Sequence, residues 1–335
     1  MKRKYSTIIL IGLAAALVLF IVIAERPNKR EENQKTQTSA LIFSGFKAKD
    51  ARKIEITFKG ETIALDRASK NAEWKEAGEK TYPADSAFIN DTILPFFTEA
   101  TKEQIISRNA KKYSLFGVDP ESARRVVIFG DEEATLAEFF IGKAGSVPGS
   151  YFLRNAQVEE VLSVKKDIAF LFGKTREQWR DAQIFHFDPE NAQKVSIESS
   201  KNQLVLAKEK DEWKAEVPPK AEIDSPKVAE LIKNFSGMKA QEYVENPDIK
   251  ELELTLETMQ IKISVLTKDG TEHTLLIGKY DKDAQIYYAK IAEGEYVYKI
   301  SESAFAAVNK TADELKQEKP AENIPIKKGV EGETP

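Results

Sequence analysis

The sequence predicts an α+β protein of two tandem similar halves, each an antiparallel sheet with one or two packed helices, behind an N-terminal transmembrane helix. Three observations support this fold class. A series of short motifs occurs twice in the same order, apolar and polar residues alternate within most of those motifs, and a long apolar run lies near the N-terminus. At about 150 residues per domain, a chain of 335 residues is long enough for two such halves.

The N-terminal segment is typical of a membrane anchor. An uncharged, almost wholly apolar run at residues 8–24 follows three basic residues at positions 2–4. As a helix this run is about 26 Å long, and about 30 Å when it starts at residue 5, which is close to the thickness of the hydrocarbon core of a bilayer. The positive-inside rule places the basic residues in the cytoplasm. We therefore predict a single-pass protein of the inner (cytoplasmic) membrane, held by residues 5–24, with the bulk of the chain extracytoplasmic.

The same segment has an alternative interpretation as a cleaved signal peptide, because residues 22–24 (Val-Ile-Ala) resemble the pattern that signal peptidase recognises. Both interpretations export the rest of the chain. Two other segments lack the apolar residues that a core requires, and we expect a flexible tether and a disordered tail there. The predicted organisation is anchor or signal peptide, 1–24; linker, 25–40; first α+β repeat, 41–178; second α+β repeat, 179–312; tail, 313–335.

The internal repeat is the most informative feature of the sequence. Its landmarks keep their order, and the offset between the two copies falls only from 141 to 136 residues along the chain. The matched segments are 53–56 with 194–197, 73–75 with 212–214, 84–86 with 223–225, 141–143 with 277–279, and 151–154 with 287–290. Small deletions account for the drift, so each half should repeat the same order of strands and helices.

Within each half, a strand pair and a short strand bearing a Trp should lead into a helix, and in the second half either Asp224 or Ser225 should cap it. The helix of the second half should end at Gly237, whereas Pro95 should kink or break that of the first half. The apolar stripes of the two helices are expected at Ile89, Ile93, Phe96 and Phe97 and at Val228, Leu231, Ile232 and Phe235. Further strands and a short closing helix complete each half. We expect these strands at 53–58, 62–67, 124–129, 136–142, 150–154 and 158–164 and at 194–199, 203–208, 259–265, 273–278, 286–290 and 295–300, and the closing helices near 168–172 and 303–309.

This order of motifs, together with Phe-Gly-Val-Asp-Pro at residues 116–120, resembles the bacterial domain-of-unknown-function 4340 family over residues 41–308. Members of that family tend to be encoded beside ABC-2-type exporter genes of the gliding-motility kind. The resemblance therefore implies an ABC-2-type permease and related auxiliary proteins as partners. It implies no catalytic residues, because none are established for the family. The second half has Glu-Leu-Glu-Leu at 251–254 in place of the 116–120 turn, so we do not expect that turn to be duplicated.

Composition excludes several classes of site. The chain has no Cys, which excludes disulfides, thiolate zinc sites and Cys nucleophiles. Its two histidines, His186 and His273, have no partner at metal-ligand spacing. A net charge of −4 gives no attraction to a phosphate backbone, so we expect no nucleic acid partner. The sequence predicts no cofactor, no metal site and no catalytic residue.

A few motifs resemble catalytic signatures. Gly-Lys-Thr at 173–175 resembles the end of a P-loop but lacks the preceding Gly, and the two Ile-Gly-Lys copies share that defect, so their glycines are expected to turn between strands. Ser-Val-Lys-Lys at 163–166 lacks the companion motifs of penicillin-recognising enzymes. Asp85 and Asp224 could form a paired-carboxylate site across a pseudo-twofold axis, but each precedes an apolar helical stripe, which favours helix capping.

Aromatic residues supply the candidate binding surface: Trp74, Trp213, Tyr287, Tyr288, Tyr296 and Tyr298. The two Trp residues occupy equivalent strands, which favours packing in a core, whereas a face of tyrosines could bind peptide or saccharide. We expect a non-enzymatic, membrane-anchored extracytoplasmic accessory or scaffold subunit of an ABC-type export system. The alternatives are a cell-envelope module that binds glycan or peptide and an envelope hydrolase that uses Asp85 and Asp224.

Overall fold

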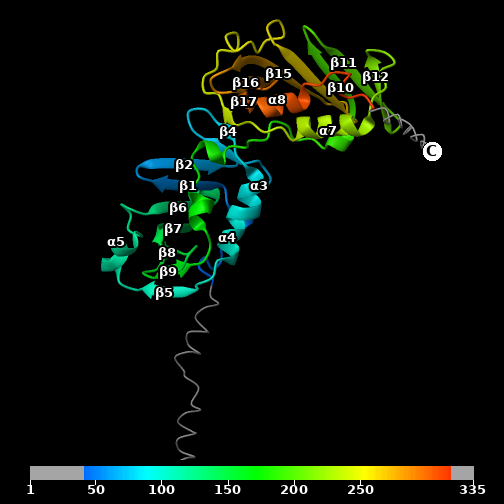
Figure 1. The fold of residues 1–335 in the computed structure, drawn as a ribbon. Helices are drawn as coiled ribbons and strands as arrows, with labels where there is room; N and C mark the ends of the chain where they lie inside the picture. The colour runs from blue at the N-terminus through cyan, green and yellow to red at the C-terminus, as the bar shows by residue number, and fades with distance from the viewer. Residues whose placement is uncertain (1–40, 318–335) are drawn as a thin grey trace, which may run out of the picture. The chain divides into compact units, whose positions relative to one another are not determined.

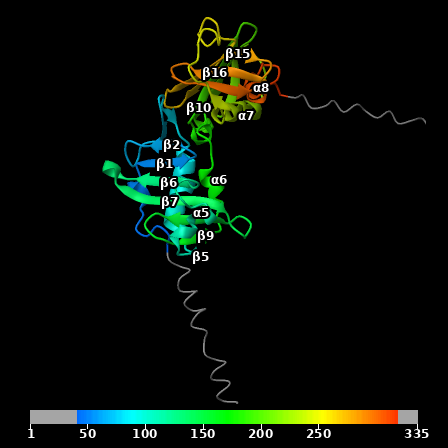
Figure 2. The same cartoon turned by 90° about the vertical axis from the view of Figure 1, so that its left-hand side faces the viewer.

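Residues 41–317 are described by the computed structural model, and they divide into two units between Asp181 and Ala182. The predicted anchor or signal peptide, the predicted linker and residues 318–335 of the predicted tail lie outside the described residues. Within residues 41–317, no helix is long and apolar enough to span a bilayer. Each unit has one antiparallel sheet with a few helices, so the α+β class and the two similar halves are confirmed (Figures 1 and 2).

The first unit contains a nine-stranded sheet with the order β4-β3-β2-β1-β6-β7-β8-β9-β5, which runs down the unit in Figure 1. Every adjacent pair is antiparallel. The strands are β1 (Lys53–Phe58), β2 (Glu61–Asp66), β3 (Lys75–Ala77), β4 (Tyr82–Pro83), β5 (Gln104–Ser107), β6 (Arg124–Phe129), β7 (Thr135–Ala144), β8 (Tyr151–Asn155) and β9 (Val161–Val164). The short strands β4 and β5 at its two edges were not predicted.

Helices cover both faces of this sheet. The helices are α3 (Ser86–Phe88), α4 (Leu94–Glu99), α5 (Tyr113–Phe116) and α6 (Ile168–Phe172). On one face, side chains from α4 and α6 pack with alternate strand residues in one core that includes Phe97, Phe139 and Phe172. On the other face, residues at and after α5 cover Phe140 and Val161. Successive residues of these strands therefore point to opposite faces of the sheet, and both faces are buried in this unit.

Pro95 does not break the first helical segment. A π-helical turn, Ile89–Ile93, joins α3 to α4, and the amide of Leu94 donates to the carbonyl of Ile89. Because Pro95 has no N–H to donate, the wider turn just before it lets the helical path continue. The predicted apolar stripe is retained, since Ile89, Ile93, Phe96 and Phe97 are all buried.

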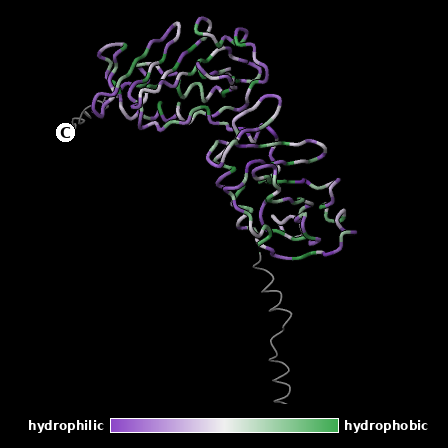
Figure 3. The backbone as a smooth tube through the Cα atoms, turned by 180° about the vertical axis from the view of Figure 1, so that it is seen from behind, coloured by the Kyte–Doolittle hydropathy of each residue, from purple (hydrophilic) through white to green (hydrophobic). Residues whose placement is uncertain are grey.

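The second unit repeats the same sheet with the order β12-β11-β10-β14-β15-β16-β17-β13. Its strands are β10 (Ala192–Ser199), β11 (Gln203–Glu209), β12 (Glu212–Val217), β13 (Glu242–Tyr243), β14 (Ile261–Thr267), β15 (Glu272–Asp281), β16 (Ile286–Ile291) and β17 (Val297–Ser301). When β3 is aligned with β12, every following strand in the first order has a counterpart in the second. Of the described strands, β4 alone has no counterpart. Hydrophobic residues recur along the strands of both units (Figure 3).

Two helices, α7 (Ser225–Ser236) and α8 (Glu302–Val308), lie side by side on one face of the second sheet (Figure 1). The predicted stripe of α7 is buried through Val228, Leu231, Ile232 and Phe235, and Gly237 caps the helix as expected. The equivalent of α7 in the first unit is α3 with α4, and the equivalent of α8 is α6.

The closing segment of each unit is also duplicated, which corrects two predicted boundaries. In the first unit, Trp179 is buried and its carbonyl accepts from the amide of Asp85 at 2.9 Å. In the second, Leu315 is buried and its carbonyl accepts from the amide of Asp224 at 2.8 Å. The first unit therefore continues past residue 178 to Asp181, and the predicted tail is wrong at residues 313–316, which belong to the second unit.

The Ile-Gly-Lys glycines do not turn between strands. Gly142 lies within β7 and Gly278 within β15, each at an irregularity in the pairing with the next strand. A Cβ at Gly142 would overlap the carbonyl oxygen of Phe116, and a Cβ at Gly278 would overlap that of Leu252. Each Gly is therefore required because a loop backbone crosses directly over it.

That crossing loop is duplicated, contrary to the expectation from sequence. Gly117 has φ +67°, and Glu253, which stands 136 residues later, has φ +58°. The amide of Val118 donates to the carbonyl of Tyr113 at 3.1 Å, and the amide of Leu254 donates to that of Ile249 at 2.9 Å. The two turns thus share one backbone conformation, although Phe-Gly-Val-Asp-Pro and Glu-Leu-Glu-Leu have no residue in common.

Candidate functional site

The two predicted Trp residues are buried in equivalent positions. Trp74 is fully buried, and its indole N–H donates to Oδ1 of Asn90 at 3.1 Å. Trp213 is 6% exposed. The backbone amide of Trp74 donates to the hydroxyl of Ser86 at 2.8 Å, and that of Trp213 donates to the hydroxyl of Ser225 at 2.9 Å. Trp213 lies in β12, whereas Trp74 immediately precedes β3 and is not itself in a strand. Both backbone amides connect this part of the chain to the first residue of the following helix.

The two candidate acids cap helices. Oδ1 of Asp85 accepts from the amide of Phe88 at 2.9 Å, and Oδ1 of Asp224 accepts from the amide of Lys227 at 3.4 Å. The capping prediction is confirmed in both units. Each carboxylate satisfies a backbone N–H of its own helix, a use that the fold itself requires.

The four predicted tyrosines do not share one face. Tyr287 pairs with Ile300 across β16 and β17 and stacks on Phe305 of α8, with ring centroids 3.9 Å apart, so it lies on the helix-covered face. Tyr298 is buried, and both it and Tyr296 pack against Tyr243. Tyr288 pairs with Lys299 and lies on the opposite face. The sequence pattern therefore groups tyrosines that the pleat of the sheet separates.

The histidines are placed differently from each other. The ring of His273 stacks on Phe187 with centroids 4.3 Å apart, and burial lowers the pKa of His273. His186 is exposed. Among residues 41–317, no group of three or more acidic, His or Cys side chains could hold a metal ion.

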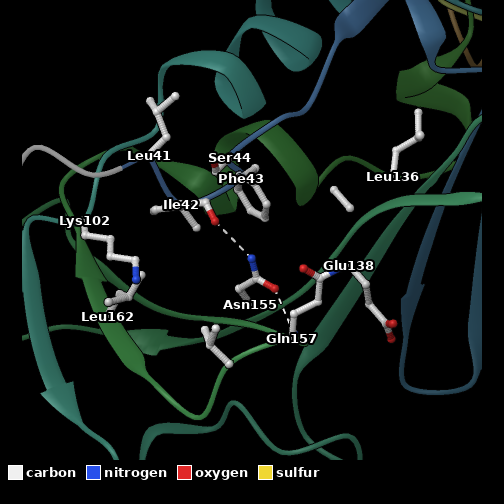
Figure 4. Close-up of a pocket in the computed structure, with 12 residues that line it drawn as sticks. Leu41, Ile42, Phe43, Ser44, Lys102, Leu136, Glu138, Asn155, Gln157 and Leu162 are labelled. Carbon is white, nitrogen blue, oxygen red and sulfur yellow. Dashed lines mark hydrogen bonds between the residues drawn. The ribbon is translucent and has the colours of Figure 1, made fainter.

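A cavity of about 240 Å³ lies in the first unit where the described chain begins (Figure 4). Its walls come from residues 41–44, from residues 136–138 of β7 and from the turn after β8. Asn155 lies at its centre: the side-chain amide donates to the carbonyl of Ile42 at 3.0 Å, and Oδ1 accepts from the amide of Gln157 at 2.9 Å. We call this the Leu41 cavity.

The rim of the Leu41 cavity carries both apolar and charged groups. Leu41 is 42% exposed and Val158 is 37% exposed. The ammonium of Lys102 donates to Glu160 at 2.8 Å, and Arg108 donates to the same carboxylate at 3.2 Å. The hydrogen bond from Lys102 and the charges of both cations lower the pKa of Glu160, although partial burial opposes this. The rim therefore combines exposed apolar side chains with an ion-paired carboxylate.

A second cavity in the first unit has a volume of about 580 Å³ and lies between strands β1, β2 and β6 and residues 173–177. We call it the Arg124 cavity. The sequence predicted neither cavity, because their walls come from segments far apart in the chain. The Gly-Lys-Thr motif at 173–175 is the sequence motif that lies in the wall of the Arg124 cavity. It follows α6, whereas the same motif in a P-loop precedes a helix.

Comparison with known proteins gives a family and no assigned activity. The family described as "Domain of unknown function (DUF4340)" matches residues 74–255, more than half of the chain. The match starts in the first unit and extends into the second. No curated protein and no solved structure matches the chain.

Proposed function

The chain belongs to the DUF4340 family, and from that premise we propose that it is a non-enzymatic, membrane-anchored extracytoplasmic subunit that scaffolds an ABC-type exporter. The exporter, with an ABC-2-type permease as the direct partner, comes from the resemblance of the sequence to proteins encoded beside such genes. The membrane attachment comes from the apolar run at residues 8–24.

The observation that carries the non-enzymatic part is the use of the duplicated polar residues. Asp85 and Asp224 cap helices, and the hydroxyls of Ser86 and Ser225 accept from the backbone amides of Trp74 and Trp213. Duplicated acids are what a paired-carboxylate hydrolase would need, and here each satisfies a backbone donor instead. The repeat thus supports a rigid structural body.

The Leu41 cavity is the surface that we assign to the permease. Residues 25–40 are the predicted tether, with a mean reach of about 20 Å or more. Leu41 directly follows this tether, so a membrane anchor would tie its cavity to the bilayer by those residues alone. The exposed apolar side chains of Leu41 and Val158 would be covered in such a contact.

Photo-crosslinking in membranes tests this assignment. Benzoylphenylalanine placed at Val158 should form an adduct with the permease after illumination. The matched control is the same substitution at Leu256 in the second unit, which is 61% exposed and apolar. A permease adduct from position 158 and none from position 256 supports the proposal. No permease adduct at 158, with both variants expressed and folded, contradicts it.

Topology is tested separately. A reporter enzyme that is active only after export, fused after Pro335 so that the second unit stays intact, should be active. A cytoplasm-dependent reporter at the same point should be silent, and the opposite pattern contradicts the extracytoplasmic placement. The mass of the purified chain distinguishes the uncleaved anchor, which we propose, from a signal peptide that is cut after Ala24.

A further inference from the structure

The Arg124 cavity has a mixed lining with an ordered distribution of charge. Its apolar wall consists of Ile56, Phe58 and Ile63 on the strand pair β1 and β2. Two of its cations, Arg124 and Lys174, are partly buried, whereas its two acids, Glu61 and Glu177, are exposed. The positive charges therefore lie in the less solvated part of the cavity, where a charge interacts more strongly with a ligand.

Arg124 has no acceptor for its guanidinium among the described residues. Its guanidinium carbon lies 4.4 Å from the centre of the Phe58 ring. No hydrogen bond or ion pair joins the guanidinium to any side chain or backbone oxygen in residues 41–317, and burial lowers the pKa of Arg124. A guanidinium that is partly withdrawn from water without a protein acceptor is costly, and an anion could accept from two of its five N–H groups.

Lys174 is a second cation of the same cavity. Its ammonium lies 3.7 Å from the centre of the Phe88 ring and makes one long hydrogen bond of 3.4 Å to the carbonyl of Gln178. Burial lowers the pKa of Lys174, although the charge of Asp85 opposes this. The remaining cation, Arg176, is already engaged with Glu76 and the carbonyl of Thr62. Among the described residues, Arg124 is thus the cation available to a ligand, because the ammonium of Lys174 lies against Phe88 and Gln178, which do not line the cavity.

The second unit shows that the fold does not require a cation here. Arg124 is opposite Ile141 in the pairing of β6 and β7, and Ile261 is opposite Ile277 in the pairing of β14 and β15. The equivalent of Arg124 is therefore Ile261, a buried apolar residue. In the second unit, the side-chain amide of Asn202 donates to the carbonyl of Lys310 at 3.0 Å. This hydrogen bond joins the strand pair β10 and β11 to the closing segment.

We propose that the Arg124 cavity binds a small organic carboxylate with an apolar body. The carboxylate would accept a bidentate pair of hydrogen bonds from Arg124, a geometry that suits a planar guanidinium. The apolar body would lie against Phe58 and Ile63. The volume of about 580 Å³ falls within the range of small-molecule sites. This site is independent of the permease contact proposed above.

Calorimetric titration of the full-length protein in lipid nanodiscs tests the proposal, with 3-phenylpropionate as the probe. We expect measurable binding of the acid and at least about tenfold weaker binding of 3-phenylpropanamide, which has the same shape without the charge. Equal binding of acid and amide overturns the proposal. Inorganic phosphate, at the same ionic strength, should not displace the acid. Displacement by phosphate at equal concentration would identify a general anion site and overturn the carboxylate assignment.

Arg124→Ile, which copies Ile261, should remove the preference for the acid over the amide, and Arg124→Gln serves as a second variant should the first fail to fold. The matched control is Arg125→Ala. Arg125 is the next residue of β6, is exposed and pairs with Glu138 at 2.7 Å, so it lies on the opposite face. Retained preference for the acid in a folded Arg124 variant, or loss of it in Arg125→Ala alone, contradicts the assignment to Arg124.

Discussion

In the first unit, Glu76 is buried between Arg176 and Arg180, and it accepts hydrogen bonds from both. In the second unit, the equivalents of Glu76 and Arg176 are Ala215 and Ala312, and that of Arg180 is Lys316. Both units nevertheless close in the same way, because Ala84 bridges to Arg180 and Ile223 bridges to Lys316. The buried ion cluster is therefore a feature of the first unit alone and not a requirement of the fold.

The difference between the units separates residues that serve the fold from residues that serve something else. Duplicated residues, such as the capping acids and the Trp pair, are used in the same way twice. Arg124, Glu76 and Arg176 are charged in the first unit and replaced by Ile or Ala in the second. A buried charge costs desolvation free energy that an apolar residue avoids, so these positions indicate a role specific to the first unit.

The largest effects should come from the duplicated core. Trp74→Ala and Trp213→Ala should each lower the free energy of unfolding by about 3 to 5 kcal/mol. Trp74→Ala should cost more, because Trp74 is fully buried, donates to Asn90 and lies under the guanidinium of Arg67 at 4.7 Å. Hydrogen exchange resolved by peptide should localise each loss to one unit. A variant that unfolds like the wild type but loses partner binding would identify its Trp as a recognition residue.

Sequence reasoning succeeded where a pattern is local. The long strands, α7 and both closing helices lie within a few residues of their predicted positions, since alternation and caps are read from neighbouring residues. It failed at the edge strands β4, β5 and β13, which are two to four residues long and exist through tertiary pairing. The Leu41 and Arg124 cavities were missed for the same reason, because distant segments form their walls.

The boundary errors have a more specific cause. Lys-Thr at 174–175 and at 310–311 begin equivalent closing segments, and the backbone amides of Thr175 and Thr311 donate to the side chains of Gln178 and Glu314 at 2.9 and 2.8 Å. This two-residue match is the sequence evidence that the closing segments are equivalent, because the buried residues Trp179 and Leu315 differ in type. The rest of the second copy is charged and polar, so its composition resembles that of a disordered tail.

The ion cluster should give the next largest effect. Glu76→Ala should lower the free energy of unfolding by about 3 kcal/mol, because it removes the buried carboxylate to which the guanidinium of Arg180 donates. This loss is at the lower end of the cost of breaking a buried ion pair, because the side chain of Arg176 is 38% exposed and solvent screens its charge. Chemical denaturation of the first unit measures the change.

A triple variant is the matched test of the same comparison. Glu76→Ala combined with Arg176→Ala and Arg180→Lys reproduces the residues of the second unit. It should recover part of the stability that Glu76→Ala loses, since Arg176 is removed and a Lys side chain, exposed at Lys316 in the second unit, can carry its charge to solvent more easily than Arg180. A triple variant that is less stable than Glu76→Ala alone would show that the ion cluster supports the fold of the first unit.

The helix caps should have smaller effects that also rank the two units. Asp85→Ala and Asp224→Ala should each cost about 0.5 to 2 kcal/mol, with the larger loss at Asp85 because its hydrogen bond is shorter. Asn at either position keeps an acceptor oxygen, so its effect on thermal stability should be slight. Asn variants that fold normally yet lose export function would contradict the non-enzymatic role, because Asn cannot hold the charge of a catalytic carboxylate.

The smallest effect should come from exchanging the two crossing turns. Glu253 holds φ +58° with a side chain, a conformation that costs a non-Gly residue about 1 to 2 kcal/mol, whereas Gly117 adopts it freely. Glu253→Gly should therefore raise the stability of the second unit by up to about 1 kcal/mol. Two costs reduce the gain: the unfolded chain becomes more flexible, and the exposed hydrogen bond from Gln260 at 3.1 Å is lost.

Gly117→Ala should lower the stability of the first unit by a similar amount, because the added Cβ would also lie 3.0 Å from the flexible side chain of Lys143. Thermal unfolding of the two variants in parallel measures both changes. Opposite signs support one shared turn conformation, whereas destabilisation by both substitutions would show that Glu253 contributes a contact that outweighs its backbone strain.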